Sequence, residues 1–302
     1  MHAQTDFAPL PPQLARGAAL LAAGNLQQAE ELVREYLLHH GAHIEGMRLL
    51  AQIAVRLGVL DDAEYLLGHL LERAPAHQEA RGEYAAVLLQ RRRYLPALHE
   101  ARRLLQQAPG NARWRRLYAS ACDGLGAYDE ALRIYRELLE ETPDAELQLS
   151  IAHLLKTRGS DPGEAVAAFR AATRLPQGAG EAFLALANTK SYRFSEEEIA
   201  RMRAAEAIRG SALGERYRLC FALGKALEDR HEYAASFEYY QRGNSLKRSE
   251  LAYRPEMAQR HLRSRAEVRG QHHAPANVGE EPGKPWRIDE VAGAEYVNRL
   301  PV

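Results

Sequence analysis

One alanine position recurs every 34 residues through the first half of the chain, and this interval constrains the fold more than any other feature. The alanines in this phase are Ala29, Ala63, Ala97, Ala131 and Ala165. Twelve residues before the first four stand the small residues Gly17, Ala51, Ala85 and Ala119. Twelve residues after three of them stand the prolines Pro75, Pro109 and Pro143. Small residues allow two helices to approach closely, and a proline stops a helix, so each period predicts a pair of packed helices.

This spacing resembles that of the tetratricopeptide repeat, in which each unit has a first helix, a tight turn and a second helix. The resemblance implies an all-α, right-handed solenoid of about seven helix pairs. In the second unit the helices are predicted over residues 44–57 and 61–73, with Gly58 at the turn. Further along, Ser195 and Glu198 have the spacing of a capping box that opens a helix. His153 occupies a position where the phase expects a small residue at the helix crossing.

Three regions are predicted from composition and periodicity. Residues 1–9 form an N-terminal arm, residues 10–254 the repeat solenoid, and residues 255–302 a linker or disordered tail. The tail is predicted because residues 265–285 hold glycine, proline, histidine and charged residues with almost no aliphatic side chains. Such a segment buries too little apolar surface to offset its conformational entropy.

The overall charge is balanced, with 40 basic and 40 acidic residues. Nucleic acids and anionic membrane surfaces attract proteins through a large positive field, so neither is an expected partner. The two cysteines, Cys122 and Cys220, lie far apart and fit packed positions, which indicates a reducing compartment. The start of the chain lacks the pattern of a signal peptide, and no long apolar run predicts a membrane span. We therefore expect a cytoplasmic protein.

The last repeats carry a more specific pattern. It comprises LANTKSYRFS at residues 186–195 and FALGKALED at 221–229, followed by Tyr233, Tyr240, Gly243 and Asn244. Together these segments resemble the repeat region that precedes the catalytic domain of bacterial tetratricopeptide sulfotransferases. The resemblance covers roughly residues 10–255 and is specific over residues 181–253.

In that family an α/β domain follows the repeats and transfers sulfuryl from 3′-phosphoadenosine 5′-phosphosulfate. Its phosphosulfate loop, Pro-x-x-Gly-Thr/Ser-Thr, holds the cofactor on backbone amides at a helix N-terminus. This chain has no such loop. The resemblance therefore implies a sulfotransferase lineage without transferring any catalytic or cofactor-binding residue. The polar tail is expected to be a truncated or frame-shifted end.

Other candidate chemistry has a structural explanation. Gly224-Lys225 lacks the remainder of a phosphate-binding loop. His39, His40 and His43 form a cluster without cysteine and stand near a helix end, where histidines interact with the helix dipole. Cys122 has no histidine near it in the sequence. We therefore predict a non-catalytic chain without a cofactor or metal.

The predicted functional surface is the concave face lined by the first helices of the repeats. The residues predicted to bind a partner there are Arg48, Gln52, Arg56, Arg113, Arg116, Ser120 and Arg158. Glu79 and Glu83 are expected between the arginines, and Glu83 stands where a tetratricopeptide carboxylate clamp would have asparagine. Arginine forks favour carboxylates, so an extended peptide with acidic positions is the predicted partner.

Three functions remain open from the sequence. The first is a non-catalytic protein or peptide interaction module. The second is the repeat region of a sulfotransferase whose catalytic domain is missing from this chain, and the third is a self-associating scaffold. The sequence predicts neither the identity of the partner nor the oligomeric state.

Overall fold

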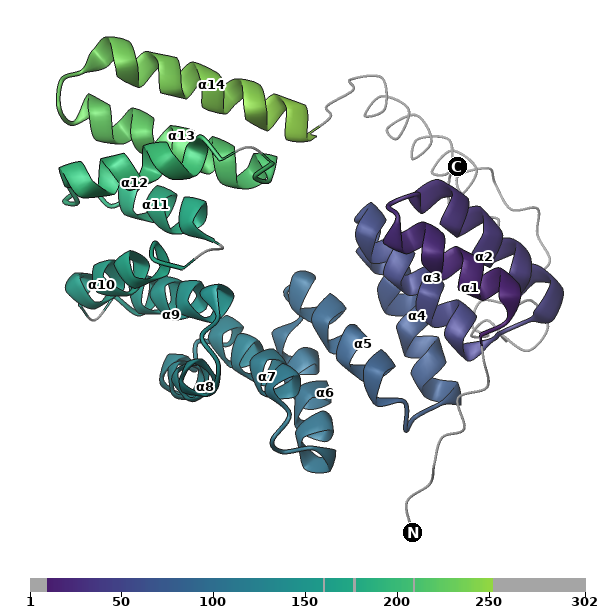
Figure 1. The fold of residues 1–302 in the computed structure, drawn as a ribbon. Helices are drawn as coiled ribbons and strands as arrows, with labels where there is room; N and C mark the ends of the chain where they lie inside the picture. Colours follow the sequence, from purple (N-terminus) through teal and green to yellow (C-terminus); the bar gives the residue numbers. More distant parts are fainter. Residues whose placement is uncertain (1–9, 160, 176–177, 209, 252–302) are drawn as a thin grey trace, which may run out of the picture. The chain divides into compact units, whose positions relative to one another are not determined.

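The computed structural model describes residues 10–159, 161–175, 178–208 and 210–251. The predicted arm, the predicted tail and the predicted end of the solenoid at residue 254 lie outside these ranges. The described residues form fourteen α-helices and no β-strand, which confirms the predicted all-α fold of about seven helix pairs (Figure 1). No helix in these ranges combines the length and apolar character that crossing a membrane requires.

The helices are α1 (Pro12–Ala22), α2 (Leu26–His40), α3 (Ile44–Leu57), α4 (Leu60–Arg73), α5 (Gln78–Gln90), α6 (Tyr94–Gln107), α7 (Ala112–Gly124), α8 (Tyr128–Glu141), α9 (Ala145–Arg158), α10 (Pro162–Ala172), α11 (Ala179–Ala187), α12 (Glu196–Glu206), α13 (Leu213–Glu228) and α14 (Tyr233–Leu251).

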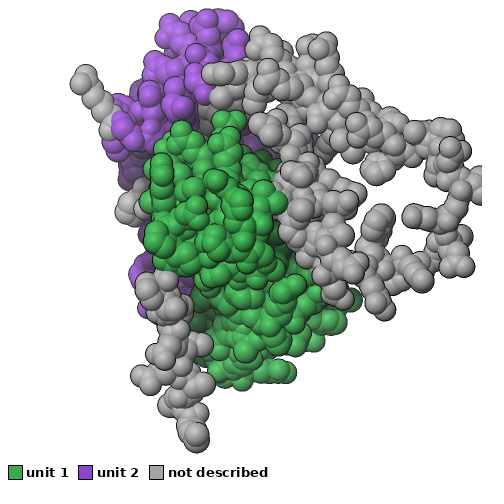
Figure 2. Space-filling view, turned by 90° about the vertical axis from the view of Figure 1, so that its right-hand side faces the viewer, with its two compact units in different colours: residues 1–127, 275–302 green, residues 128–274 purple. Residues whose placement is uncertain are grey.

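The described residues divide into two compact units, which Figure 2 colours separately. Unit 1 ends at Ala127 and contains α1 to α7, whereas unit 2 begins at Tyr128 and contains α8 to α14. Within unit 1, helices that follow one another pack together, as in α3 with α4 and α5 with α6. In unit 2 the most extensive helix pair is α13 with α14, which lie side by side in Figure 1.

The alanines that define the repeat are buried, as their role at helix crossings requires. All five are at most 5% exposed, and so are Ala51, Ala85 and Ala119. Gly17 shows why the position must be small, because a Cβ there would lie 2.7 Å from Val33 Cγ2 of α2. Close packing of this kind lets two helix backbones approach and leaves no room for extra methylene groups.

One of these contacts in unit 1 joins the first helices of two successive repeats. Gly82 of α5 lies against Trp114 of α7, whose side chain is 2% exposed. A Cβ built at Gly82 would overlap the indole ring. Gly68 in α4 makes no such contact, since the nearest atom to its Cβ would be a Tyr84 ring carbon at 4.0 Å.

We predict opposite effects of alanine at these two helical glycines. Helix propensity alone favours alanine by about 1 kcal/mol, so Gly68→Ala should stabilise the protein by up to that amount. Gly82→Ala should destabilise it by about 1–3 kcal/mol because the Trp114 ring must move. Urea denaturation followed by circular dichroism measures both. A stabilised Gly82→Ala variant would contradict the packing between α5 and α7.

Glu198 organises the polar interior of unit 2. It accepts hydrogen bonds from the Tyr192 hydroxyl at 2.6 Å, from Arg170 Nε at 3.0 Å and from the Ser195 backbone at 3.0 Å. The Ser195 side chain accepts from the Glu198 backbone in return, which confirms the predicted capping box. Burial acts to raise the pKa of Glu198, but these hydrogen bonds and the Arg170 charge outweigh it, and the pKa lies below the usual 4.5. The carboxylate therefore stays ionised although its side chain is only 4% exposed.

Glu198→Gln should cost about 1–3 kcal/mol of unfolding free energy at neutral pH, because a buried charged acceptor is lost. A carboxyl group with a lowered folded-state pKa stabilises the fold above its unfolded pKa, and this contribution disappears as pH falls through the lowered value. The difference between Glu198→Gln and wild type should therefore shrink as pH falls below 4.5. Urea denaturation at a series of pH values measures it. The matched variant Glu197→Gln, at an exposed neighbour, should stay within about 0.5 kcal/mol of wild type. An equal pH response in both variants would contradict the assignment.

One expectation about the repeat phase is wrong. His153 does not lie at a helix crossing, because its side chain is 48% exposed. Its Nε2 lies 3.2 Å from Glu181 Oε1, and its ring meets the edge of Phe169. The neighbouring Ala152 is fully buried instead. The fifth repeat is therefore shifted by one residue at this position.

Candidate functional site

The first helices of three successive repeats in unit 1 begin at equivalent residues. His43, His77 and Asn111 are spaced by 34 residues and stand at the N-caps of α3, α5 and α7. His43 Nδ1 accepts from the Gly46 backbone at 3.3 Å, and His77 Nδ1 accepts from the Ala80 backbone at 3.2 Å. The Asn111 side chain accepts from two backbone amides in the same way. Because the caps share one phase, equivalent residues on these helices lie at the same distance from each helix start.

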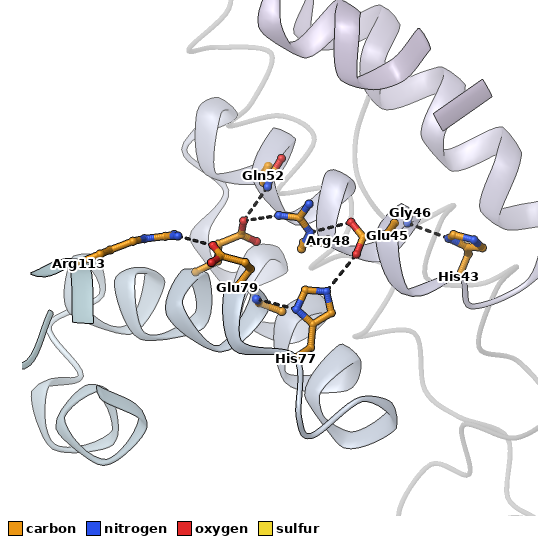
Figure 3. A network of polar contacts seen from close by, with 10 residues as sticks. His43, Glu45, Gly46, Arg48, Gln52, His77, Glu79 and Arg113 are labelled. Atoms are coloured by element: carbon orange, nitrogen blue, oxygen red, sulfur yellow. Dashed lines mark hydrogen bonds and ion pairs between the residues drawn. The ribbon is translucent and has the colours of Figure 1, made fainter. Parts of the chain in front are cut away.

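The position two residues after each cap carries a charged side chain. These residues are Glu45, Glu79 and Arg113. The positions of Arg48 and Gln52 in α3 correspond to Gly82 and Ala86 in α5, and to Arg116 and Ser120 in α7. We call the surface formed by Glu45, Arg48, Gln52, Glu79, Glu83 and Arg113 the α3–α5–α7 face. Figure 3 shows the polar contacts that run across it.

Two donors of α3 converge on one carboxylate oxygen of α5. Arg48 Nη1 donates to Glu83 Oε1 at 2.8 Å, and Gln52 Nε2 donates to the same oxygen at 2.7 Å. The Arg48 and Glu83 side chains are 27% and 18% exposed, so this pair is partly shielded from water. Shielding strengthens the pair relative to ion pairs on an open surface.

A second carboxylate orients the same arginine from its other side. Arg48 Nε donates to Glu45 Oε2 at 2.9 Å (Figure 3). Glu45 Oε1 lies 3.0 Å from His77 Nε2. Because His77 Nδ1 accepts the cap hydrogen bond, the ring proton of the neutral imidazole belongs to Nε2, which therefore donates to Glu45. The N-cap of α5 is thus connected through Glu45 to Arg48 of α3.

Both charged groups are held ionised. Burial acts to raise the pKa of Glu45, but hydrogen bonds from His77 and Arg48 and their charges outweigh it and lower the pKa. Burial acts to lower the pKa of Arg48, but the carboxylates of Glu83 and Glu45 raise it. The Arg48 guanidinium and the Glu45 carboxylate therefore remain charged at neutral pH.

The contact between α5 and α7 on this face is more exposed. Arg113 Nη1 pairs with Glu79 Oε2, and both side chains are about half exposed, at 52% and 54% (Figure 3). The Arg113 guanidinium also lies over the Trp114 ring, 4.8 Å from its centroid. The arginine is thus fixed by an aromatic ring below it and a carboxylate beside it.

The predicted site residues differ in their contacts, in their exposure and in the unit to which they belong. Arg48, Gln52 and Arg113 contact the acids that the sequence expects between them. Arg56 is exposed in the last turn of α3, and Arg116 and Ser120 are half-buried on α7. Arg158 belongs to unit 2, where its Nη1 lies 3.2 Å from Asp129 of α8. The roles of His43 and His77 were not predicted from the sequence, although their spacing of 34 residues indicates equivalent N-caps.

Metal-binding side chains do not gather in the described ranges. These ranges contain no cluster of three or more histidine, cysteine or acidic residues that could hold a metal ion. His40, part of the predicted histidine cluster, stacks on Tyr36, with its Nδ1 2.9 Å from the Tyr36 carbonyl oxygen. Burial, with the nearby Glu206 charge, raises the pKa of the Cys220 thiol to about 11. This thiol is protonated near neutral pH and is a poor nucleophile.

Unit 2 contains an acidic hollow of about 610 Å³, lined by residues that include Asp144, Glu181 and Glu215. Two of these carboxylates cap helices. Asp144 accepts from the first backbone amides of α9, and Glu215 Oε2 accepts from the Gly180 amide of α11 at 2.8 Å. Glu181 lies beside His153. The acids around the hollow thus have structural partners.

Residues 88–154 match the model of a family described as tetratricopeptide repeat. Together with the helix pairs, this match decides the fold. The fold is that of a tetratricopeptide repeat protein.

Among solved structures, a tetratricopeptide repeat protein from Parabacteroides merdae ATCC 43184 is similar to this chain. It has 22% identity over 70% of this chain and 83% of its own, with a TM-score of 0.56. A MamA protein from Desulfovibrio magneticus RS-1 has 19% identity over 56% of this chain and 98% of its own, with a TM-score of 0.49. YrrB, described as a TPR protein with an unusual peptide-binding site, has 15% identity over 59% of this chain and 91% of its own, with a TM-score of 0.48. No curated protein matches the sequence.

We predict that the two ion pairs of the α3–α5–α7 face differ in strength. A double-mutant cycle with Arg48→Ala and Glu83→Ala should give a coupling above about 1 kcal/mol, because both side chains are shielded. The same cycle with Arg113→Ala and Glu79→Ala should give about 0.2–1 kcal/mol, as exposed pairs do. Urea denaturation of the single and double variants measures both. Equal couplings would show that burial does not strengthen the Arg48 contacts.

Proposed function

We propose that this chain is a non-catalytic protein- or peptide-interaction module and that the α3–α5–α7 face of unit 1 is its contact surface. One observation carries the proposal: Arg48 and Gln52 direct two donors at a single carboxylate oxygen, at 2.8 and 2.7 Å. Side chains so arranged on a rigid helix can recognise an anionic group. The registered caps support the proposal further, because they repeat the same positions along three first helices.

The proposed partner is an extended segment with acidic positions. Arg113 and Arg48 each hold a carboxylate of the chain itself, so carboxylates of a partner have matching chemistry. Arg56, Arg116 and Ser120 extend the proposed surface on α3 and α7. Arg158, in the other unit, remains a separate prediction. A charged surface of this kind binds weakly and loses affinity as salt rises.

A cytoplasmic location is part of the proposal. Both cysteines are buried free thiols, which suits a reducing compartment. Fractionation of the producing cells tests this location.

The binding surface is tested by reversing charge on first helices and, as a matched control, on second helices. Arg56→Glu with Arg113→Glu should weaken partner binding by about 1–3 kcal/mol, the range for charge-assisted hydrogen bonds. The control, Arg73→Glu with Arg103→Glu, makes the same charge change on exposed positions of α4 and α6 and should bind like wild type.

Partners captured by the full chain are identified by mass spectrometry, and their dissociation constants are measured at low and high salt. Circular dichroism checks that each variant keeps its helices. Equal losses in both double variants would indicate a general charge effect, and no loss in either would place the contact surface elsewhere.

The second proposed function is that of a repeat region in a sulfotransferase that uses 3′-phosphoadenosine 5′-phosphosulfate. It is favoured by the pattern over residues 181–253, which resembles the repeats of that family and supplies Tyr192, Ser195 and Glu198 to the polar centre of unit 2. Because this chain has no phosphosulfate loop, neither function predicts binding of 3′-phosphoadenosine 5′-phosphate, and calorimetric titration of the chain should show none that saturates. The downstream genomic DNA separates the two functions: a phosphosulfate loop encoded there, in any frame, would favour the sulfotransferase alternative.

A further inference from the structure

The last described helix, α14, exposes two aromatic side chains. Tyr233 is 62% exposed and Phe237 is 67% exposed, and the two lie one helical turn apart on the same face. The repeat at the end of a solenoid normally presents a polar outer face. Large apolar side chains that are exposed side by side are typical of contact surfaces. This face of α14 therefore has the composition of an interface.

The register of α14 follows from its packing on α13. Ser236 takes the place of the recurring alanine, is buried, and donates its hydroxyl to the Gly224 carbonyl oxygen at 2.8 Å. Tyr240, four residues later, packs on Gly224, where a Cβ would lie 2.9 Å from the Tyr240 ring. Val33 of α2 packs on Gly17 of α1 in the same way and at the same two positions of the repeat. Residues of α14 can therefore be compared directly with those of the other second helices.

The following repeat covers the equivalent residues in unit 1. Tyr233 and Phe237 of α14 correspond to Tyr94 and Leu98 of α6. Tyr94 packs against Gly124 of α7, the first helix of the next repeat, because a Cβ at Gly124 would overlap the Tyr94 ring. Leu98 is only 7% exposed. Among the described residues no helix follows α14, so its two aromatic side chains stay uncovered.

Helix α1 has an uncovered face of the complementary kind. Its exposed residues Ala15 and Ala19 lie one turn apart. The residue of α3 that corresponds to Ala15 is Leu49, whose Cδ2 would lie 3.3 Å from a Cβ at Gly17 of α1. The position of Ala19 is at most 2% exposed in the next three first helices of unit 1, where it is held by Ile53, Val87 and Ala121. The face by which a first helix packs on the preceding repeat is thus exposed in α1, since no described helix precedes it.

We propose that α14 of one copy of this chain packs against α1 of a second copy, so that the chains associate head to tail. The contact would repeat the junction between α6 and α7, with Tyr233 and Phe237 in the places of Tyr94 and Leu98. Aromatic side chains on one face and alanines on the other are complementary in size, as close packing requires. Because the two faces differ, each added copy presents a new one, and association continues into longer assemblies or a closed ring. This inference goes beyond the proposed function, since the α3–α5–α7 face takes no part in the contact.

Two other occupants of the α14 face would behave differently. A pairing of α14 with α14 of a second copy would be symmetric, would stop at two chains and would leave α1 uninvolved. A segment of the same chain that follows Leu251 would cover the face within one copy, and no association would result. The mass of the protein in solution therefore separates the three arrangements.

The experiment uses the full chain and follows its mass by sedimentation velocity over a range of protein concentrations. The mass of wild type should rise above the single-chain value of 33.8 kDa as the concentration increases. Phe237→Glu and Ala19→Glu each place a charge in one of the two faces, and each should raise the dissociation constant at least about tenfold. Both residues are exposed, so the helices should form in both variants, which circular dichroism checks. Phe237→Ser and Ala15→Glu replace them if either fails to fold.

A mixture of the two variants tests the direction of the contact. Phe237→Glu keeps an intact α1 face, and Ala19→Glu keeps an intact α14 face. Mixed together they should form a complex of two chains and no larger one, although neither variant associates alone. If Ala19→Glu associated as strongly as wild type, α14 would pair with itself and the head-to-tail proposal would be overturned.

The matched control is Leu95→Glu, which places the same charge at an exposed apolar residue of α6 outside both faces. It should associate like wild type. An equal loss of association in Leu95→Glu would overturn the proposal in favour of a general effect of charge. A single-chain mass for wild type at every concentration would overturn it in favour of a face that is covered within one copy.

Discussion

Close approach of helices at small residues is the constraint on which the structure depends. At Gly17 and Gly82 the opposing side chains, Val33 and Trp114, occupy the space of a Cβ, and the buried alanines serve the same purpose elsewhere. Because each crossing tolerates only a small residue, the sequence interval between these residues must equal the length of one helix pair. The period of 34 residues therefore follows from the packing of one helix pair on the next.

Charged residues serve two different purposes in the two units. In unit 2, Glu198 and Glu206 are buried and fully engaged, Glu206 by Arg216 at 3.0 Å and Arg242 at 2.9 Å. Such groups stabilise because each carboxylate oxygen has a donor, and truncation of either acid would leave arginines without their acceptor. On the α3–α5–α7 face the carboxylates are more exposed, and Glu83 is only half satisfied, because its Oε2 has no hydrogen-bond partner among the described residues.

Local signals predicted much of the fold. The first helix of the second repeat begins at Ile44 and ends at Leu57, as its apolar spacing and Gly58 indicated, and the Ser195 capping box needed only four consecutive residues. The helix crossing of the fifth repeat was predicted at His153, but Ala152 is the buried residue. A shift of one residue changes which side chain lies at the crossing without changing the local composition. Ala152 next to it is equally compatible with a helix.

The candidate site was predicted only in part, since it depends on contacts across repeats. Periodicity placed Arg48, Gln52 and Glu83 on one face, but their mutual hydrogen bonds depend on side-chain torsions and on residues more than 30 positions apart. The hydrogen bond from His77 to Glu45 was not predicted either. It depends on the tautomer that His77 adopts as an N-cap, which leaves the ring proton on Nε2. The sequence predicted Glu79 and Glu83 between the arginines, and the structure shows Arg113 and Arg48 paired with these two acids of α5.

Because the N-caps of α3, α5 and α7 share one phase, equivalent residues recur from one of these helices to the next. Packed helices lie roughly 8–10 Å apart, whereas an extended chain advances about 3.3–3.6 Å per residue. A strand-like ligand crossing these helices would therefore meet equivalent positions at about every third residue. If the proposed function holds, a ligand would meet Glu45, Glu79 and Arg113 in this order, and so two acids followed by a base. This order would give the surface a direction, so that a ligand and its reversed sequence would not be equivalent.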